Sequence, residues 1–377
     1  MCQVICSKAK KIMKYFVGIF VLILFVCSCC NISNKDSGLI SYSISPNSTA
    51  KWNLFDVIDS CFYVKLKTTD STLLGNIYRI EVADSIIAIL DDISNSLQVY
   101  SIEGEPIGVV FKPGLGPGEY VQLSDFVLSE KELSLRILDA MQSKMLDYSL
   151  TGEFIKEIKM PFNTGVSCFA KMDEEVYVFD QKLRRNSEEW KYDILLLSES
   201  STEVRKLRPY FEYSDITLAS RRSFNRVNDT LTYFPTYNDT LFSIVGENFI
   251  PRYKLDFGDY WYDYDYLYDK IKNPQTFIEG LKNANFIYFL NVLETSSHIW
   301  LDFCFKEKYY HTVINKSNSK VSTYLRNDDE CRFFYGLPLA TWNDFFVIPV
   351  KPDYLNKEYG IEVSEDDNPY LLFVKFN

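Results

Sequence analysis

Runs of alternating apolar and polar residues, separated by short polar turns, recur along most of the chain. The run "NIYRIEVADSIIAILDD" at residues 76–92 is an example, with its turn at residues 82–85, and similar runs follow at 124–139 and 166–180. A period of two places alternate side chains on the two faces of a pleated strand. The pattern therefore predicts β-strands joined by hairpins.

A second kind of hairpin follows each run and repeats at a nearly fixed distance. "LQVYSIEGEPI" matches "MLDYSLTGEFI", with Tyr100 aligned on Tyr148 and Gly104 on Gly152, 48 residues later. The corresponding positions in the later hairpins are Leu196, Ile244, Val313 and Val374. The spacings are 48, 48, 48, 69 and 61 residues. Six units of four strands predict an all-β fold, a six-bladed β-propeller with four-stranded blades.

The two ends of the repeat region are expected to complete one blade together. The sixth unit ends after its third strand, and "CFYVKLKT" at residues 61–68 is a lone strand before the first unit. An N-terminal strand that closes the last blade would remove an open sheet edge. The stretch "KPGLGPGEY" at residues 112–120 is interpreted as the turn between one blade's outer strand and the next blade's inner strand.

The long spacing between the fourth and fifth units indicates an insertion between those blades. "TFIEGLKNANF" has helical spacing of Phe277, Leu281 and Phe286, so the insertion is expected to include a short helix. Before it, "DYWYDYDYLYD" sets six aromatic residues among four acids, a composition suited to stacking on sugar rings and accepting from their hydroxyls. The predicted ligand-binding residues there are Tyr260, Trp261, Tyr262, Tyr264 and Tyr266. The alternative is an aromatic lid packed on the propeller.

A cluster of arginines is the second candidate binding feature. "ASRRSFNR" gathers Arg221, Arg222 and Arg226 in an acidic protein. Guanidinium groups hold anions through charge-assisted hydrogen bonds, so Arg221 and Arg222 are candidate ligand-binding residues. The alternative is that these side chains form salt bridges between blades.

The N-terminal segment has the features of a lipoprotein signal peptide. Four lysines precede a 12-residue apolar run at residues 15–26, which is too short to span a bilayer as a helix. The residues "VCSC" that follow, ending at Cys29, resemble a lipobox. We expect cleavage after Ser28 and lipidation of Cys29. Cys30 is the alternative anchor, and an ordinary cleaved signal peptide is the other alternative.

These features divide the chain into three parts. Residues 1–28 are the signal peptide, residues 29–50 a flexible polar tether, and residues 51–377 the propeller. No run of acids follows the anchor cysteine, so we expect a lipid-anchored protein of the cell envelope, on the outer membrane and facing the periplasm.

Charge and composition exclude several functions. The formal net charge is −11, and removing residues 1–28, which hold four lysines and no acids, takes it to −15. An acidic protein does not neutralise phosphates, so nucleic acid is not expected as a partner. The mature chain has no CxxC pair and only two histidines, so neither a zinc site nor a Ser-His-Asp arrangement is predicted.

Some chemistry stays open at this point. His298 and His311 lie within strand patterns, where packing in the core is favoured, and a Cys304–His311 nucleophile pair is the alternative. Acidic pairs such as Asp91-Asp92 fall at turns, where solvated carboxylates are expected. No cofactor or metal is predicted, although calcium held by carboxylates at the propeller axis is an alternative.

Several motifs together resemble the six-bladed β-propeller lipoproteins of Bacteroides-type bacteria. They are the lipobox, "GLGPGEY" after the first hairpin, "YSLTGEFIKEI" in the second, "PRYKLDFG" after the fourth and "NPYLLFVKF" at the end. The resemblance covers residues 50–377. It implies the propeller fold and an envelope location, and it carries over no catalytic residue.

The expected function is that of an envelope binding module, with a glycan, a peptide or a partner protein as its ligand. The alternative is a propeller enzyme, a lyase or hydrolase that uses carboxylates at the axis, with or without a metal ion. A propeller supports either role, so the side chains at the axis and on the surface have to decide between them.

Overall fold

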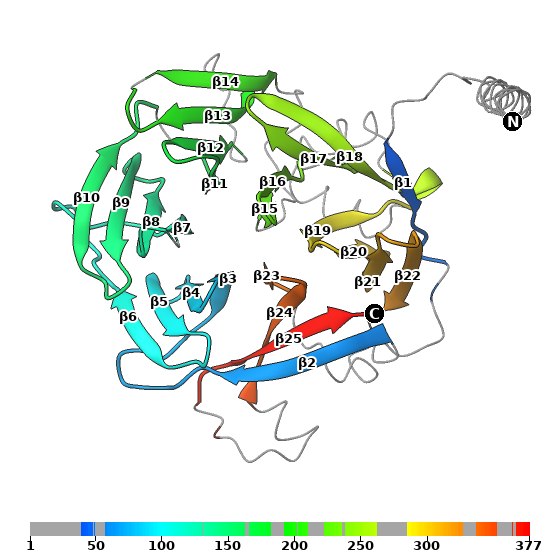
Figure 1. Ribbon diagram of the computed structural model, residues 1–377, viewed down its shortest axis with the longest axis horizontal. Coiled ribbons are helices and arrows are strands. Elements are labelled where there is room, and N and C mark those ends of the chain that lie inside the picture. Colours follow the sequence, from blue (N-terminus) through cyan, green and yellow to red (C-terminus); the bar gives the residue numbers. More distant parts are fainter. Residues whose placement is uncertain are drawn as a thin grey trace, which may run out of the picture. The chain divides into compact units, whose positions relative to one another are not determined.

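Six sheets are arranged around a common axis in the part of the chain that follows residue 40 (Figure 1). The computed structural model describes residues 39–47, 49, 57–129, 131–162, 166–181, 192–201, 203–209, 222–235, 238–261, 285–326, 337–352, 364 and 367–377. The sheets follow one another in chain order around the ring, as the repeats predict. The six-bladed β-propeller is therefore confirmed.

Each of the first three blades is a four-stranded antiparallel sheet built from consecutive strands. Blade 1 consists of β3 (Ile77–Ala83), β4 (Ile86–Asp91), β5 (Ser96–Ser101) and β6 (Pro106–Val110). Blade 2 consists of β7 (Asp125–Ser129), β8 (Ser134–Asp139), β9 (Lys144–Ser149) and β10 (Phe154–Lys159). Blade 3 consists of β11 (Cys168–Lys171), β12 (Val176–Asp180), β13 (Tyr192–Ser198) and β14 (Val204–Pro209).

Blades 4 and 6 each include a strand from the N-terminal part of the chain, and blade 5 is again built from consecutive strands. Blade 4 consists of β15 (Phe224–Val227), β16 (Thr230–Tyr233), β17 (Thr240–Val245), β18 (Asn248–Asp256) and β1 (Ile40–Ser43). Blade 5 consists of β19 (Tyr288–Glu294), β20 (His298–Phe305), β21 (Lys308–Asn315) and β22 (Lys320–Leu325). Blade 6 consists of β23 (Ala340–Trp342), β24 (Phe345–Val350), β25 (Tyr370–Phe376) and β2 (Ile58–Lys65).

The predicted closure of the ring is confirmed. Strand β2 pairs with β25 in the antiparallel direction, with Cys61 opposite Val374. The strand lies at residues 58–65, so it begins and ends three residues before the predicted 61–68. First and last strands of the ring thus hydrogen-bond to each other, and β25 does not end the sheet as an unpaired edge.

The repeated tyrosine explains how one blade is tied to the linker that enters it. The Tyr100 hydroxyl donates to the carbonyl oxygen of Thr72 at 3.1 Å, and the Tyr148 hydroxyl donates to that of Gly118 at 2.6 Å. Both rings are fully buried. Burial raises the pKa of Tyr100 to about 12, so the hydroxyl stays protonated and remains a donor.

The repeated glycine explains how neighbouring blades approach each other. Gly104 and Gly152 have φ values of +87° and +88°, which L side chains rarely adopt. A Cβ on Gly104 would also collide with the carbonyl oxygen of Lys65, and one on Gly152 with that of Val109. The hairpin turn of one blade therefore lies directly against the outer strand of the preceding blade.

Asp91 corrects the expectation of a solvated turn carboxylate. It is fully buried at the end of β4, and its oxygens accept from the amides of Gly75 at 2.7 Å and Ile93 at 3.0 Å. Burial alone would raise the pKa of Asp91, but the hydrogen bonds, with that from Gly75 foremost, hold it below its usual value. Asp139, at the matching position of blade 2, accepts from the amide of Val121 at 2.7 Å.

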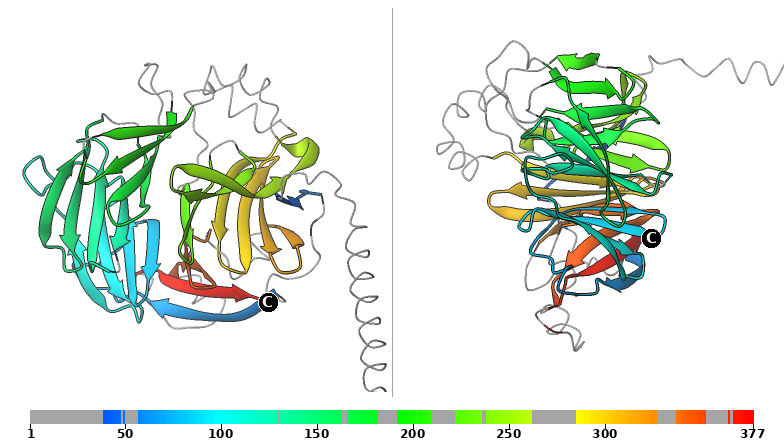
Figure 2. Two further views of the ribbon diagram at one scale, coloured as in Figure 1. Left: turned by 45° about the horizontal axis from the view of Figure 1, so that its top comes forward. Right: turned by 90° about the vertical axis from the view of Figure 1, so that its left-hand side faces the viewer.

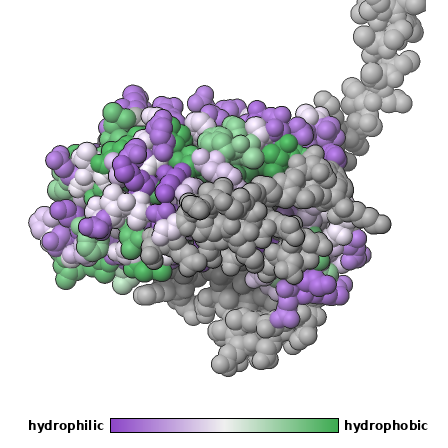
Figure 3. Space-filling view, turned by 90° about the horizontal axis from the view of Figure 1, so that it is seen from below, coloured by the Kyte–Doolittle hydropathy of each residue, from purple (hydrophilic) through white to green (hydrophobic). Residues whose placement is uncertain are grey.

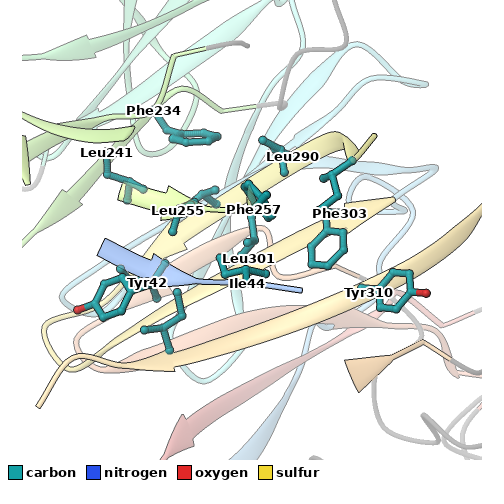
Figure 4. Packing of buried hydrophobic residues seen from close by; sticks show 14 of the residues in the cluster. Tyr42, Ile44, Phe234, Leu241, Leu255, Phe257, Leu290, Leu301, Phe303 and Tyr310 are labelled. Atoms are coloured by element: carbon teal, nitrogen blue, oxygen red, sulfur yellow. The ribbon is translucent and has the colours of Figure 1, made fainter. Parts of the chain in front are cut away.

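Strand β1 was not expected. The sequence assigns residues 29–50 to a flexible tether, but Ile40–Ser43 pairs with β18 as the fifth strand of blade 4. Tyr42 and the following Ile44 are buried in the hydrophobic cluster between blades 4 and 5 (Figure 4). In Figure 2 the blue β1 lies beside the yellow-green strands of these blades.

The predicted insertion helix is not confirmed, because residues 262–284 lie outside the described residues. Its described N-terminal flank is a 3-10 turn, η3 (Gly258–Tyr260). In the part of the chain that the structure describes, no helix is long and apolar enough to cross a membrane.

Ion pairs around the buried Arg136 join blades 2 and 3. Arg136 on β8 donates from Nε and Nη2 to the two carboxylate oxygens of Asp147, each at 2.5 Å, and from Nη1 to Glu199. Lys156 donates to the other oxygen of Glu199 at 2.8 Å. The guanidinium carbon of Arg136 lies 4.6 Å from the ring centroid of Tyr177. Glu199 is thus enclosed by two cations.

Replacing Glu199 should make the fold less stable near neutral pH and remove part of its acid sensitivity. The pKa of Glu199 is lowered to about 2, because hydrogen bonds from Arg136 and Lys156 outweigh the effect of its burial. A lowered folded-state pKa contributes stability above the unfolded value of about 4.5, and that stability is lost as the pH falls toward 2. We expect Glu199→Gln to cost on the order of 1–3 kcal/mol at pH 7 in urea unfolding, and less at pH 3.5.

The matched control is Glu174→Gln. Glu174 pairs with Lys131, but both side chains are well exposed, so this exchange should leave the unfolding midpoint unchanged. Equal losses for the two variants, or a Glu199→Gln loss that does not depend on pH, would contradict the assignment.

Candidate functional site

Charged side chains from three blades meet at the propeller axis. Arg79 and Glu81 lie on the inner strand of blade 1, Asp125 begins that of blade 2, and Arg222 precedes that of blade 4. Arg79 Nη2 lies 2.5 Å from Glu81 Oε1, and Arg79 also pairs with Asp125. Arg222 Nη2 lies 3.6 Å from the same Glu81 oxygen. Blades 1 and 4 are opposite each other in a ring of six, so this last contact crosses the axis (Figure 1).

Both axial carboxylates are also bound to backbone of the next blade. Glu81 Oε2 accepts from the amide of Leu128 in blade 2 at 2.6 Å. Asp125 Oδ2 accepts from the amide of Phe169 in blade 3 at 2.9 Å. Each carboxylate therefore has a cation on one oxygen and an amide on the other.

Arg79 is buried at the axis, and Arg222 is half-buried. Burial lowers the pKa of Arg79 to about 10, with Glu81 acting in the opposite direction and Arg222 in the same one. Burial likewise lowers the pKa of Arg222, and Glu81 opposes it. A pKa near 10 still leaves Arg79 protonated at pH 7.

Neutral polar groups fill the other side of the axis. Asn225 on β15 donates from Nδ2 to the carbonyl oxygen of Glu294 in blade 5 at 2.7 Å. Thr341 on β23 donates to Asn225 Oδ1 at 3.3 Å. Blades 4, 5 and 6 are thereby joined through two neutral side chains and the backbone carbonyl of Glu294.

The arrangement at the axis gives little scope for acid–base or metal chemistry. Glu81 and Asp125 have their oxygens occupied, whereas a general acid or base must exchange a proton with the substrate. Within the described ranges, no group of three or more His, Cys, Asp and Glu residues could hold a metal ion. The calcium alternative therefore finds no set of ligands in this part of the chain.

The histidines belong to the core. His311 Nδ1 lies 2.5 Å from Asp302 Oδ1, which also accepts from Trp300 Nε1 at 2.7 Å, and all three side chains are buried. Cys304 hydrogen-bonds to Tyr288, and burial raises the pKa of its thiol. A nucleophilic cysteine needs a lowered pKa. The geometry therefore gives no support to a Cys304–His311 nucleophile.

The aromatic segment after β18 begins as part of the packed core. Trp261 stacks on Phe257, with ring centroids 5.3 Å apart and planes inclined by 9°. Tyr260 packs edge-on against Phe305 at 5.3 Å, and its hydroxyl accepts from Asn47 Nδ2 at 2.6 Å. These two residues fit the alternative of a packed lid better than that of a ligand surface.

Several predicted site residues cannot be placed in the site. Tyr262, Tyr264, Tyr266, Arg221 and Cys29 lie outside the described residues. Arg222 contacts Glu81 and donates from Nε to the carbonyl oxygen of Phe224 at 2.6 Å. Of the two alternatives for Arg222, the geometry fits the inter-blade salt bridge.

Phe62, Trp342 and Phe345 form an aromatic surface on blade 6, which the sequence did not predict. Phe62 is 38% exposed and stacks on the buried Phe373, with centroids 4.7 Å apart and planes inclined by 7°. Phe345 meets Phe62 edge-on at 5.3 Å. Trp342 donates from Nε1 to the carbonyl oxygen of Asp84 at 3.1 Å, which uses the polar edge of its indole.

This aromatic surface depends on pairing between distant segments. Phe62 on β2 and Phe373 on β25 become neighbours only when the ring closes. Figure 3 views the molecule from the side of β2 and shows apolar areas interrupted by polar ones. The sequence offers only the aromatic residues of the hairpin around Asn343 as a signal.

The packing of Trp261 makes a testable prediction. Trp261→Ala should destabilise the protein by about 1–3 kcal/mol, because it removes apolar area from the cluster between blades 4 and 5. Leu115→Ala, at a highly exposed side chain, is the control and should have no effect. Thermal unfolding of both variants is the measurement, and an unchanged midpoint for Trp261→Ala would show that the ring does not support the fold.

Comparisons with known proteins agree with this architecture. A solved structure of a Bacteroides fragilis protein, whose name describes it as exported, superposes with a TM-score of 0.78 at 19% identity, covering 90% of this chain and 99% of that one. A Bacteroides vulgatus protein of the DUF4221 family gives a TM-score of 0.54 at 12% identity, covering 85% and 97%. No functionally curated protein matches the sequence. The sequence model of DUF5128, described as a 6-bladed beta-propeller, matches residues 33–349, and the chain belongs to this family.

Proposed function

We propose that the protein is a lipid-anchored binding module of the cell envelope, and that the aromatic surface on blade 6 is its binding site. The observation that carries the proposal is the exposed stacking of Phe62 over Phe373 beside Trp342 and Phe345. Half-exposed aromatic rings held by a rigid sheet offer flat faces at little entropic cost. A glycan, or an apolar side chain of a peptide or partner protein, is the chemistry that such faces accept.

The axis supports this choice over an enzyme. Glu81 and Asp125 are each paired with arginine and with a backbone amide. Releasing Glu81 for catalysis would take a counter-ion from both Arg79 and Arg222, and releasing Asp125 would take one from Arg79. Loss of a counter-ion from a buried charge is costly. A surface site requires no such change.

The proposed location rests on the N-terminal sequence. Cys29 follows the apolar run and would carry the lipid, so that the propeller remains at the membrane. The similar Bacteroides fragilis protein, described as exported, supports an envelope position. Tyr262, Tyr264 and Tyr266, next to the packed Tyr260 and Trp261, stay a prediction for a second contact region.

Lipidation is tested by Cys29→Ser. We expect the wild-type protein to incorporate labelled palmitate and to sediment with membranes, and the variant to lose both properties. Cys30→Ser is the matched control and should keep them. Label retained by Cys29→Ser but lost by Cys30→Ser would move the anchor to Cys30, and label in neither protein would refute lipidation.

The binding site is tested by the double variant Phe62→Ala/Trp342→Ala. Binding to envelope and dietary glycans on an array, or to peptides and envelope proteins in parallel arms, should weaken at least about tenfold, as expected for loss of central aromatic contacts. Leu73→Ala/Ile93→Ala removes exposed apolar residues elsewhere and is the control. Unchanged binding by a stably folded Phe62→Ala/Trp342→Ala protein would overturn the assignment.

A further inference from the structure

Residues 40–47 and 49 form a strap that follows the outer edge of blade 4 and reaches blade 5. The amide of Ile44 donates to the carbonyl oxygen of Asp256 at 2.8 Å, and Asn47 Nδ2 donates to Tyr260 at 2.6 Å. From the first contact to the second, the residue numbers increase both in the strap and in the segment that begins with β18. The strap therefore runs in the same direction as β18. Thr49 then forms a parallel bridge with Thr323 on β22.

The strap is held by packing as well as by hydrogen bonds. Tyr42 and Ile44 are almost completely buried, and Figure 4 shows them over the strands of blade 5. The rings of Tyr42 and Tyr253 lie 5.6 Å apart. The chain therefore leaves the propeller at a defined place, Ile40, on the outer edge of blade 4.

The length of chain between that place and Cys29 limits how the propeller can be oriented. Ten residues, 30–39, join the two, and fully extended they span about 35 Å. A propeller unit of residues 41–377 should have a radius of gyration of about 20 Å, and thus a diameter of roughly 50 Å. The tether is shorter than the molecule, so the edge of the propeller opposite to blade 4 cannot face the bilayer.

We propose that the strap orients the propeller at the membrane, with the outer edges of blades 4 and 5 against the phospholipid headgroups. This inference rests on the proposed lipid anchor. Exposed apolar side chains on these edges suit an interface with headgroups. They are Ile40 on β1, Ile250 on β18 and Leu325 on β22, with Val245 and Tyr309 on the adjoining strands β17 and β21. Lysines lie on the same strands: Lys254 is four residues after Ile250 on β18, 3.8 Å from Asp239, and Lys308 precedes Tyr309 on β21.

The orientation has a consequence for the binding site. Blade 1 is opposite blade 4, and Trp342 of the aromatic surface contacts the β3–β4 turn of blade 1 through the Asp84 carbonyl. The aromatic surface thus lies on the side of blade 6 toward blade 1, away from blade 5, and would remain open to ligands. The strap thereby links the position of the anchor to the accessibility of the site.

Photo-crosslinking to lipid tests the proposal. The lipidated full-length protein is placed in phosphatidylethanolamine–phosphatidylglycerol vesicles with benzoylphenylalanine at position 250 in blade 4 or at position 93 in blade 1. We expect lipid adducts to be at least about fivefold more abundant at 250, although Ile93 is the more exposed native residue. Equal adducts at the two positions in protein that floats with the vesicles would overturn the orientation and leave the anchor intact.

A variant with a loosened strap tests whether the strap sets the orientation of the propeller. Tyr42→Ser/Ile44→Ser should release residues 40–49, which lengthens the tether from ten to about twenty residues, about 70 Å when extended. The difference between positions 250 and 93 should then fall toward unity, while flotation is retained. A difference that persists in this variant would show that the strap does not set the orientation. Protein that does not float at all would overturn the anchor, and the orientation with it.

Discussion

The carboxylate of Glu81 contacts groups from three blades at the propeller axis. One of its oxygens receives Arg79 of its own strand and Arg222 from the opposite blade, and the other receives the amide of Leu128 from the neighbouring blade. Blades 1, 2 and 4 are thus held to a single carboxylate. A buried carboxylate is stable only when it is paired and hydrogen-bonded, and a buried guanidinium has the same requirement. The charges at the axis therefore support one another, and removing Glu81 would take a partner from both arginines.

Away from the axis, the interfaces between neighbouring blades, here called seams, are held together by two different kinds of contact. Between blades 1 and 2 the repeated glycine turn of blade 2 lies against the outer strand of blade 1, and Tyr148 is bonded to the entering linker. Between blades 4 and 5, Glu294 of blade 5 pairs with Arg252 of blade 4 at 2.9 Å and with Lys316 at 2.9 Å. The strap adds apolar area over the same seam. The insertion lies between blades 4 and 5 in the sequence and interrupts the repeat. At this seam the strap, which is distant in sequence, makes the contacts.

The difference between the seams also explains what the sequence could predict. Alternation along strands and the 48-residue offset are local properties, so blade number, strand order and the closing strand β2 could be predicted. The strap could not, because "ISYS" is too short to be distinguished from a tether, and its burial depends on β18 and blade 5. Asp91 was misjudged because a turn carboxylate is normally solvated, and only the folded linker brings the amide of Gly75 to it. Phe62 and Phe373 are 311 positions apart, so their stacking needs the closed ring.

A rigid ring and a reactive axis make opposing demands on the same groups. Protonating Glu81 would weaken its bonds to Arg79 and Arg222 and so loosen three blades at once, whereas a catalytic carboxylate must change its protonation state in each cycle. Phe62, Trp342 and Phe345 are under no such constraint, because Phe373 and the neighbouring strands support them from below and leave part of each ring exposed. The charges at the axis can therefore serve stability while the proposed site on the surface serves binding. A strap that fixes the propeller at the membrane would determine which part of that surface a ligand can reach.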